Sequence, residues 1–205
     1  MRIAVVNEFS ARDKNPAILE ALAPTGAKML NIGMSDAAAE RDLTYIHTGL
    51  IAALALETGM ADFVVGGCGT GQGFLISAMQ YPGVFCGLVA SPLDAWLFSQ
   101  INAGNCVSLA LNKGYGWAGD IELRYIAEKL FCDEAGQGYP AHRRESQQVS
   151  RNLLAAASRA GHRDFCDILP ALDPAILGPV LQHAPFMECM EEYARAGALR
   201  ELILR

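Results

Sequence analysis

The residues best suited to chemistry lie in one segment, GGCGTGQG at residues 66–73. Five of its eight residues are glycines, so its backbone N–H groups can approach an anionic ligand closely. Cys68 lies inside the segment, and a thiol near the first turn of a helix readily becomes a thiolate. The pattern predicts an accessible thiolate beside N–H donors that can hold an anion. The equally open alternative is that Cys68 is a small residue that fills a tight turn.

Nucleotide and metal chemistry do not fit this segment. No Lys-Ser or Lys-Thr pair follows the glycines, which excludes a P-loop. The third glycine of a dinucleotide fingerprint would fall on Gln72 or Phe74, depending on the frame. The six cysteines are widely spaced and form no C-x-x-C pair, so no zinc site is indicated. The segment therefore indicates neither a nucleotide-binding loop nor a zinc site.

Short apolar runs alternate with helical patterns over the first 131 residues. Strands are predicted at residues 2–6, 28–32, 62–65, 83–89 and 106–111, and helices at 15–22, 45–58, 74–80, 92–100 and 119–131. This alternation predicts an α/β fold with a doubly wound, parallel, five-stranded sheet, a Rossmann-like three-layer α/β/α arrangement. Ligands of such sheets bind at the carboxyl ends of the strands. Glu8, after the first strand, and Cys68, after the third, should therefore lie together.

The pattern changes after Gly138-Tyr139-Pro140. Helices are predicted at residues 147–160, 174–181 and 186–204, and no strand pattern is present there. We divide the chain into an α/β core at residues 1–145 and a helical C-terminal extension at residues 146–205. His162 and His183 lie in this extension and are predicted to be on the surface. His47 is expected to be a capping or core histidine rather than a catalytic one.

Composition excludes several classes of protein. Hydrophobic residues make up 52% of the 205 residues and charged residues 19%, which excludes an intrinsically disordered chain. The net charge of −6 argues against a nucleic-acid-binding surface. No signal peptide and no membrane-spanning run is recognised, so we expect a reduced, cytoplasmic protein with no membrane partner.

The Cys68-Gly69-Thr70-Gly71-x-Gly73 core resembles the ribose-5-phosphate isomerase type B and galactose-6-phosphate isomerase family. The similarity runs from Ile3 to about Lys129 and includes Glu40-Arg41 and Tyr45-x-His47. It implies a doubly wound parallel sheet with the active site at a homodimer interface. It also implies the interconversion of aldose and ketose phosphates without a metal or an organic cofactor. We therefore expect a sugar-phosphate ligand and a homodimer or a dimer of dimers.

The resemblance also implies roles for individual residues. Cys68 would move a proton between two carbons through a cis-enediolate, with Glu8 as the second acid. The Thr70 hydroxyl and the loop N–H groups would stabilise the oxyanion. The residues expected to hold the loop, the sugar or its phosphate are Gly69, Gly71, Gly73, Asn102, Asn105, His142, Arg143 and Arg144.

Two positions depart from the family pattern. Glu8-Phe9 stands where the family has an Asp-His pair, and Ile101 stands where it has a ring-opening histidine. A substrate that is already open-chain would need no ring-opening imidazole. We therefore hypothesise a short or acyclic sugar phosphate, such as a tetrose derivative. The alternative is a non-catalytic sugar-phosphate-binding relative or a partner subunit of an isomerase.

Overall fold

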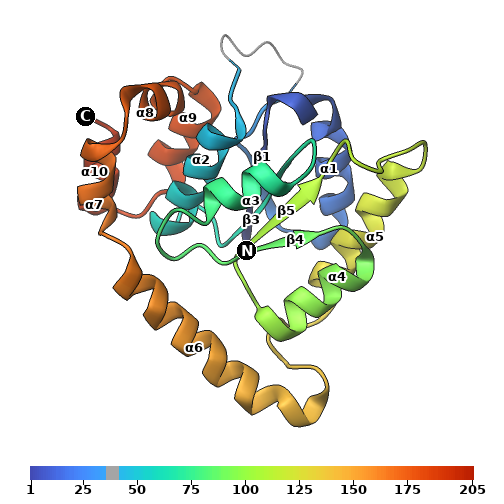
Figure 1. The fold of residues 1–205 in the computed structure, drawn as a ribbon. Helices are drawn as coiled ribbons and strands as arrows, with labels where there is room; N and C mark the ends of the chain where they lie inside the picture. The colour runs from blue at the N-terminus through green and yellow to red at the C-terminus, as the bar shows by residue number, and fades with distance from the viewer. Residues whose placement is uncertain (36–41) are drawn as a thin grey trace.

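The computed structural model describes residues 1–35 and 42–205 and contains a five-stranded parallel sheet. The strand order is β2-β1-β3-β5-β4 (Figure 1). The strands are β1 (Arg2–Asn7), β2 (Lys28–Asn31), β3 (Phe63–Cys68), β4 (Cys86–Val89) and β5 (Cys106–Ala110). Each neighbouring pair is parallel. The predicted doubly wound fold is confirmed.

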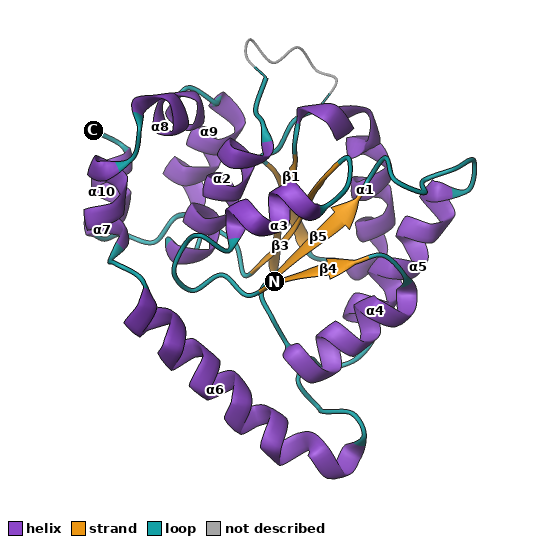
Figure 2. Ribbon diagram, viewed as in Figure 1, coloured by secondary structure: helices purple, strands orange, loops and turns teal. Residues whose placement is uncertain are grey.

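Helices cover both faces of the sheet (Figure 2). Side chains alternate along a strand, so Ile3 and Val5 of β1 pack in one buried cluster and Ala4 and Val6 in the other. The first cluster is covered by α1 (Asn15–Leu22), α4 (Pro92–Leu97) and α5 (Gly119–Phe131). The second is covered by α2 (Tyr45–Glu57), α3 (Gln72–Ala78) and part of the C-terminal segment.

The C-terminal segment contains α6 (Arg144–Gly161), α7 (Phe165–Ile168), α8 (Pro174–Leu181), α9 (Ala184–Tyr193) and α10 (Ala198–Ile203). The helix predicted over residues 186–204 is thus two helices, because the backbone leaves helical geometry between Tyr193 and Ala198. Short α7 was missed because four residues carry no periodic pattern.

The last helices share the core of the sheet. Val180, Phe186 and Met190 are fully buried in the same cluster as Leu50 and Leu54 of α2. By contrast, α6 has no buried residue and runs along the outside of the molecule (Figure 1). The division at residues 145/146 stays a prediction, since the segment after it contains both an exposed helix and core-forming helices.

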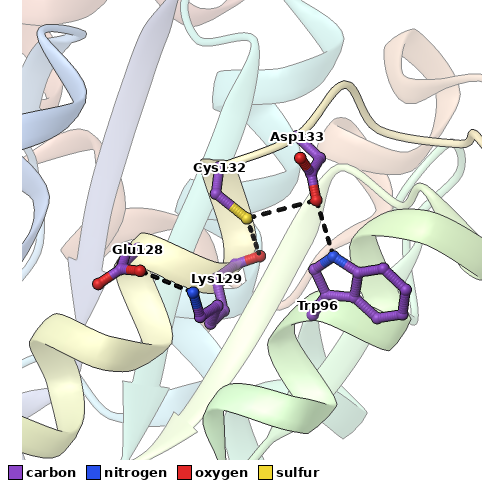
Figure 3. Close-up of polar contacts among 5 residues, drawn as sticks. All are labelled: Trp96, Glu128, Lys129, Cys132 and Asp133. Carbon is purple, nitrogen blue, oxygen red and sulfur yellow. Dashed lines mark hydrogen bonds and ion pairs between the residues drawn. The ribbon is translucent and has the colours of Figure 1, made fainter.

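A polar cluster joins α4 to the end of α5 (Figure 3). The Asp133 carboxylate accepts a hydrogen bond of 2.8 Å from Trp96 Nε1 and one of 3.5 Å from the Cys132 thiol. Partial burial, together with the bond to Asp133, raises the pKa of Cys132. This exposed thiol therefore stays protonated at neutral pH. Within residues 1–35 and 42–205, none of the helices has the length and apolar character needed to cross a membrane.

Candidate active site

Cys68 is the last residue of β3, at the carboxyl edge of the sheet. Its side chain is 5% exposed and borders the buried cluster under α2 and α3. Its carbonyl accepts a 3.0 Å hydrogen bond from the backbone N–H of Leu111, which follows β5. The cysteine is thus held on a regular strand, and the loop after it leads into α3 at Gln72.

The glycine loop directs its carbonyl groups towards β5. The Gly69 carbonyl accepts from the N–H groups of Asn112 at 3.0 Å and Lys113 at 2.9 Å, and the Gly71 carbonyl accepts from Ser108 Oγ at 2.6 Å. Gly71 has φ of +76°, a left-handed conformation that favours glycine. Among the described residues, the N–H groups of Gly69, Thr70 and Gly71 donate to no partner. These three donors are available to an anionic ligand.

Thr70 and Gly73 lie beside these donors. The Thr70 hydroxyl is on an exposed residue and accepts a long, 3.4 Å hydrogen bond from the N–H of Gln72. A Cβ at Gly73 would lie 2.8 Å from the ring of Tyr45, the first residue of α2. Glycine at this position lets α2 approach the beginning of α3 closely.

Glu8 is brought next to Cys68 by strand register. Asn7 of β1 pairs with Gly67 of β3, and the Glu8 N–H donates to the Gly67 carbonyl at 3.0 Å. The Glu8 side chain is buried and its carboxylate accepts a hydrogen bond from Ser10 Oγ. A buried carboxylate beside a thiol can move protons between substrate oxygen atoms.

Ser10 and Asn112 complete this edge of the site, and the sequence analysis missed both. Asn112 Nδ2 donates to the Ser10 carbonyl at 2.8 Å. A Cβ at Gly69 would meet Ser10 Oγ and Asn112 Nδ2, each at 3.3 Å. Their signal in the sequence was position, since each follows a predicted strand that ends at the same edge as Cys68.

Asn102 and Asn105 lie at the opposite edge of the sheet. Asn102 ends the π-helical turn η3 (Phe98–Asn102), and Asn105 directly precedes β5. The five residues of β5 separate them from the carboxyl edge by about 15 Å. The Asn105 amide donates to the Gly83 carbonyl at 2.8 Å and accepts from the Phe85 N–H at 2.8 Å, so it holds the turn before β4.

His142 and Arg143 lie in the 3-10 turn η4 (Ala141–Arg143), Arg144 is the first residue of α6, and all three are exposed at the same amino edge. The segment around them is tied to η3, because the Gly138 N–H donates to the Gln100 carbonyl and Arg151 Nη1 donates to the Ile101 carbonyl. Within one chain these three residues and Asn102 form a group of their own. The structure does not bring them to Cys68, and their role in binding stays a prediction.

The two positions that depart from the family pattern lie at opposite edges. Phe9 follows Glu8 at the carboxyl edge and is 39% exposed, with the Arg12 guanidinium 5.9 Å from its ring centre. Ile101 lies in η3 beside Asn102. Glu40 and Arg41 lie outside the described residues. In residues 1–35 and 42–205 no group of three His, Cys, Asp or Glu side chains is placed to hold a metal ion.

Comparison with known proteins identifies the family. The family model described as Ribose/Galactose Isomerase matches residues 3–145. The chain belongs to this family. Its members are sugar isomerases, which move hydrogen within one molecule and are thus intramolecular oxidoreductases.

Two solved structures match the ribose/galactose isomerase chain along its full length. One, a ribose-5-phosphate isomerase from Vibrio parahaemolyticus, is 39% identical, with 100% of this chain and 98% of that chain covered and a TM-score of 0.95. The other, a 4-deoxy-L-threo-5-hexosulose-uronate ketol-isomerase complexed with a tartrate, is 36% identical, with 100% and 99% covered and a TM-score of 0.95. No curated protein matches significantly.

A shorter structure matches only part of this isomerase. A ribose-5-phosphate isomerase B from Clostridium thermocellum is 19% identical and shares the fold, with a TM-score of 0.64. The alignment covers 100% of that chain but only 79% of this isomerase. The two full-length matches thus also cover the part of the chain that the shorter structure leaves unmatched.

Proposed function

We propose that this isomerase interconverts an aldose and a ketose through a cis-enediolate, with Cys68 as the base. The thiolate of Cys68 takes the proton from the hydroxyl-bearing carbon next to the carbonyl and returns it to the former carbonyl carbon. The negative charge that develops on oxygen would be held by the free N–H groups of Gly69, Thr70 and Gly71. Such preorganised donors lower the barrier by about 3 kcal/mol each. These three unpartnered donors beside Cys68 are the observation that carries the proposal.

Glu8 supplies the second proton transfer in this proposal. Isomerisation through an enediolate also requires a proton to leave the hydroxyl oxygen and another to reach the carbonyl oxygen. Glu8 directly follows β1, the strand that pairs with the strand of Cys68, and its carboxylate already accepts a hydrogen bond from Ser10 Oγ. It can therefore relay the hydroxyl proton, with no other oxidant, reductant or cofactor in the step.

The substrate that we propose is an open-chain sugar with an anionic end. Phe9 and Ile101 carry no group that can catalyse ring opening, which an open-chain substrate does not require. The ketol-isomerase relative acts, by its description, on a hexosulose uronate, whose charged end is a carboxylate. An open-chain sugar phosphate also has an anionic end and also needs no ring opening. In the non-catalytic alternative from the sequence analysis, the protein would bind the uronate or the sugar phosphate without converting it.

We further propose that two copies of the chain complete each active site. Asn102, Arg143 and Arg144 cannot reach Cys68 of their own chain, about 15 Å away across the sheet. Exposed apolar side chains lie on three elements: Leu153 on α6, Ile76 on α3 and Leu88 on the edge strand β4. Leu88 also borders the glycine loop, since its Cδ1 lies 2.6 Å from where a Cβ at Gly71 would be. A second copy would cover these side chains and bring its amino-edge group to the loop.

An assay of two substrates tests the proposed reaction. We expect faster turnover of 4-deoxy-L-threo-5-hexosulose uronate than of ribose 5-phosphate, measured as kcat/KM. Cys68→Ala should lower the rate on either substrate by about 10² to 10⁴, the usual contribution of a general base. The control is Cys132→Ala, which removes the thiol at the far end of α5 (Figure 3) and should leave the rate unchanged.

Each part of the proposal has a result that would contradict it. A higher kcat/KM on ribose 5-phosphate would refute the open-chain substrate. An undiminished rate in folded Cys68→Ala would remove Cys68 from the role of base. Binding of both compounds without conversion would favour the non-catalytic alternative.

A further inference from the structure

His183 is buried, although the sequence analysis predicted a surface position. It lies between α8 and α9 and is 9% exposed. Its Nε2 lies 3.1 Å from the carbonyl oxygen of Ile32, which is 151 residues away in the chain. A carbonyl can only accept, so Nε2 carries the hydrogen and donates it. Burial lowers the pKa of His183, partly offset by hydrogen bonds with the backbone of Ile32 and Gly33, so the imidazole is neutral at pH 7.

The backbone that His183 binds packs directly against the residue before Glu8. The N–H groups of Ile32 and Gly33 donate to the Val5 carbonyl at 3.1 and 2.9 Å. A Cβ at Gly33 would lie 2.5 Å from the backbone nitrogen of Asn7. The Met34 N–H donates to the Asn7 carbonyl at 2.8 Å, and Asn7 Nδ2 donates to the Met34 carbonyl at 2.9 Å. The backbone of residues 32–34 therefore holds the end of β1, and His183 binds that backbone at Ile32.

A second histidine connects α8 to the residue after Glu8. His47 Nδ1 accepts from the Thr44 N–H at 3.0 Å, and its Nε2 lies 3.1 Å from the Ala175 carbonyl of α8. Because Nδ1 accepts, Nε2 carries the hydrogen and donates to Ala175. Leu43, the neighbour of Thr44, accepts a 3.0 Å hydrogen bond from the Phe9 N–H.

We propose that helices α8 and α9 position Glu8 for proton transfer, with His183 and His47 as the positioning residues. His183 acts through Ile32 and Gly33 on Asn7, and His47 acts through Thr44 and Leu43 on Phe9. The two paths hold Asn7 and Phe9, the residues on either side of Glu8. This inference rests on the proposed role of Glu8, and it assigns a catalytic purpose to the C-terminal helices.

A double-mutant cycle between His183 and Glu8 tests the inference. His183→Leu removes the donor but keeps an apolar side chain in the buried position. We expect it to lower kcat about tenfold with little change in KM, because it misplaces a proton-transfer group. In a Glu8→Gln background the same substitution should cause no further loss, since residues that act through one another are non-additive. His183→Gln retains an N–H donor at a similar reach and should recover kcat to within about threefold.

His162→Gln is the matched control. His162 belongs to the same C-terminal segment, and its Nδ1 lies 2.9 Å from the Ser158 carbonyl. This contact is local to the end of α6 and involves none of the backbone that holds Glu8, so kcat should stay unchanged. Amide hydrogen exchange gives a readout that needs no substrate. Exchange of the Glu8 and Phe9 N–H groups should accelerate in His183→Leu but not in His162→Gln.

The outcomes separate this inference from the proposed function. Suppose that Glu8→Gln lowers the rate but His183→Leu causes the same loss in both backgrounds. The positioning role of His183 is then wrong, while the proton-transfer role of Glu8 stands. If Glu8→Gln leaves the rate unchanged, the role of Glu8 fails and the positioning role fails with it. Should His183→Leu not fold, His47→Leu and its His47→Gln rescue decide the question in the same cycle. The inference would also be overturned if folded His183→Leu had an unchanged kcat and unchanged amide hydrogen exchange at Glu8 and Phe9.

Discussion

Cys68 and Glu8 are neighbours because of strand register rather than loop conformation. Their strands pair in parallel up to Asn7 and Gly67, so both side chains emerge at the carboxyl edge. A pair set by regular strands is held more precisely than a pair on two loops. Ser10 and Asn112, by contrast, lie on the longer segments that follow β1 and β5. In the proposed mechanism, we therefore expect substitutions of Ser10 and Asn112 to leave the position of Cys68 unchanged.

At the same scale, His183 makes the stability of the isomerase depend on pH. Its folded-state pKa lies below the ordinary 6.5, so the unfolded chain binds the proton more readily. The free energy of unfolding should therefore decrease as the pH falls below about 6.5 towards the lower folded-state pKa. His183→Gln removes this titrating group and should lose less stability than the wild type between about pH 7 and pH 5. Urea unfolding at several pH values measures this.

His162→Gln serves again as the control and should keep the wild-type pH dependence. Parallel curves for the wild type and His183→Gln would contradict the expectation.

At the scale of elements, the glycine loop depends on both its dihedral angles and the strand beside it. Gly71 and Gly26 have similar positive φ values, +76° and +64°. A Cβ at Gly71 would lie 2.6 Å from Leu88 Cδ1, whereas nothing lies within 4 Å of a Cβ at Gly26. The two positions therefore share the cost of a left-handed conformation and differ in what surrounds them.

This comparison predicts different outcomes for two alanine substitutions. Gly26→Ala and Gly71→Ala should each lower the free energy of unfolding by about 1 kcal/mol through φ alone. Only Gly71→Ala should also lower kcat/KM, because its Cβ would lie 3.2 Å from the backbone of both Ala110 and Leu109, so the loop must shift and move its N–H donors. Chemical denaturation and steady-state kinetics of both variants are the measurements. Equal kcat/KM in the two would show that the loop tolerates the displacement.

At the scale of the whole molecule, the predicted site residues fall into two groups at opposite edges of one sheet. Cys68, Glu8 and the glycine loop form the group at the carboxyl edge. Asn102, Arg143 and Arg144 form the group at the amino edge, beside the exposed helix α6. A second copy of the chain can unite the two groups, whereas no rearrangement within a folded sheet can.

Mixed dimers provide the test of a shared site. Cys68→Ala and the double variant Arg143→Ala/Arg144→Ala should each be nearly inactive alone. Mixed after reversible dissociation, they should regain about a quarter of the wild-type activity, because half of the dimers then contain one intact site of two. Light scattering should show that every sample is dimeric. Failure to regain activity in confirmed mixed dimers would show that these arginines do not serve the partner's site.

The sequence predicted the sheet and most helix positions because these depend on local patterns. Apolar runs, glycines and prolines mark elements such as α5, predicted and found at residues 119–131. It also predicted that Cys68 and Glu8 meet, because parallel strands end at one edge. It did not predict Ser10 or Asn112 as site residues, because their only signal, a position after a strand, is shared by the other residues of the same loops.

The sequence by itself therefore determined the parallel α/β architecture, the glycine loop and the position of its cysteine. Only the tertiary structure decided that Asn102 and Arg143 lie away from Cys68, and that His183 is buried against Ile32. The first set follows from interactions between residues close in the chain, which leave a periodic signal. The second follows from packing between segments up to 151 residues apart, which no local signal in one sequence records.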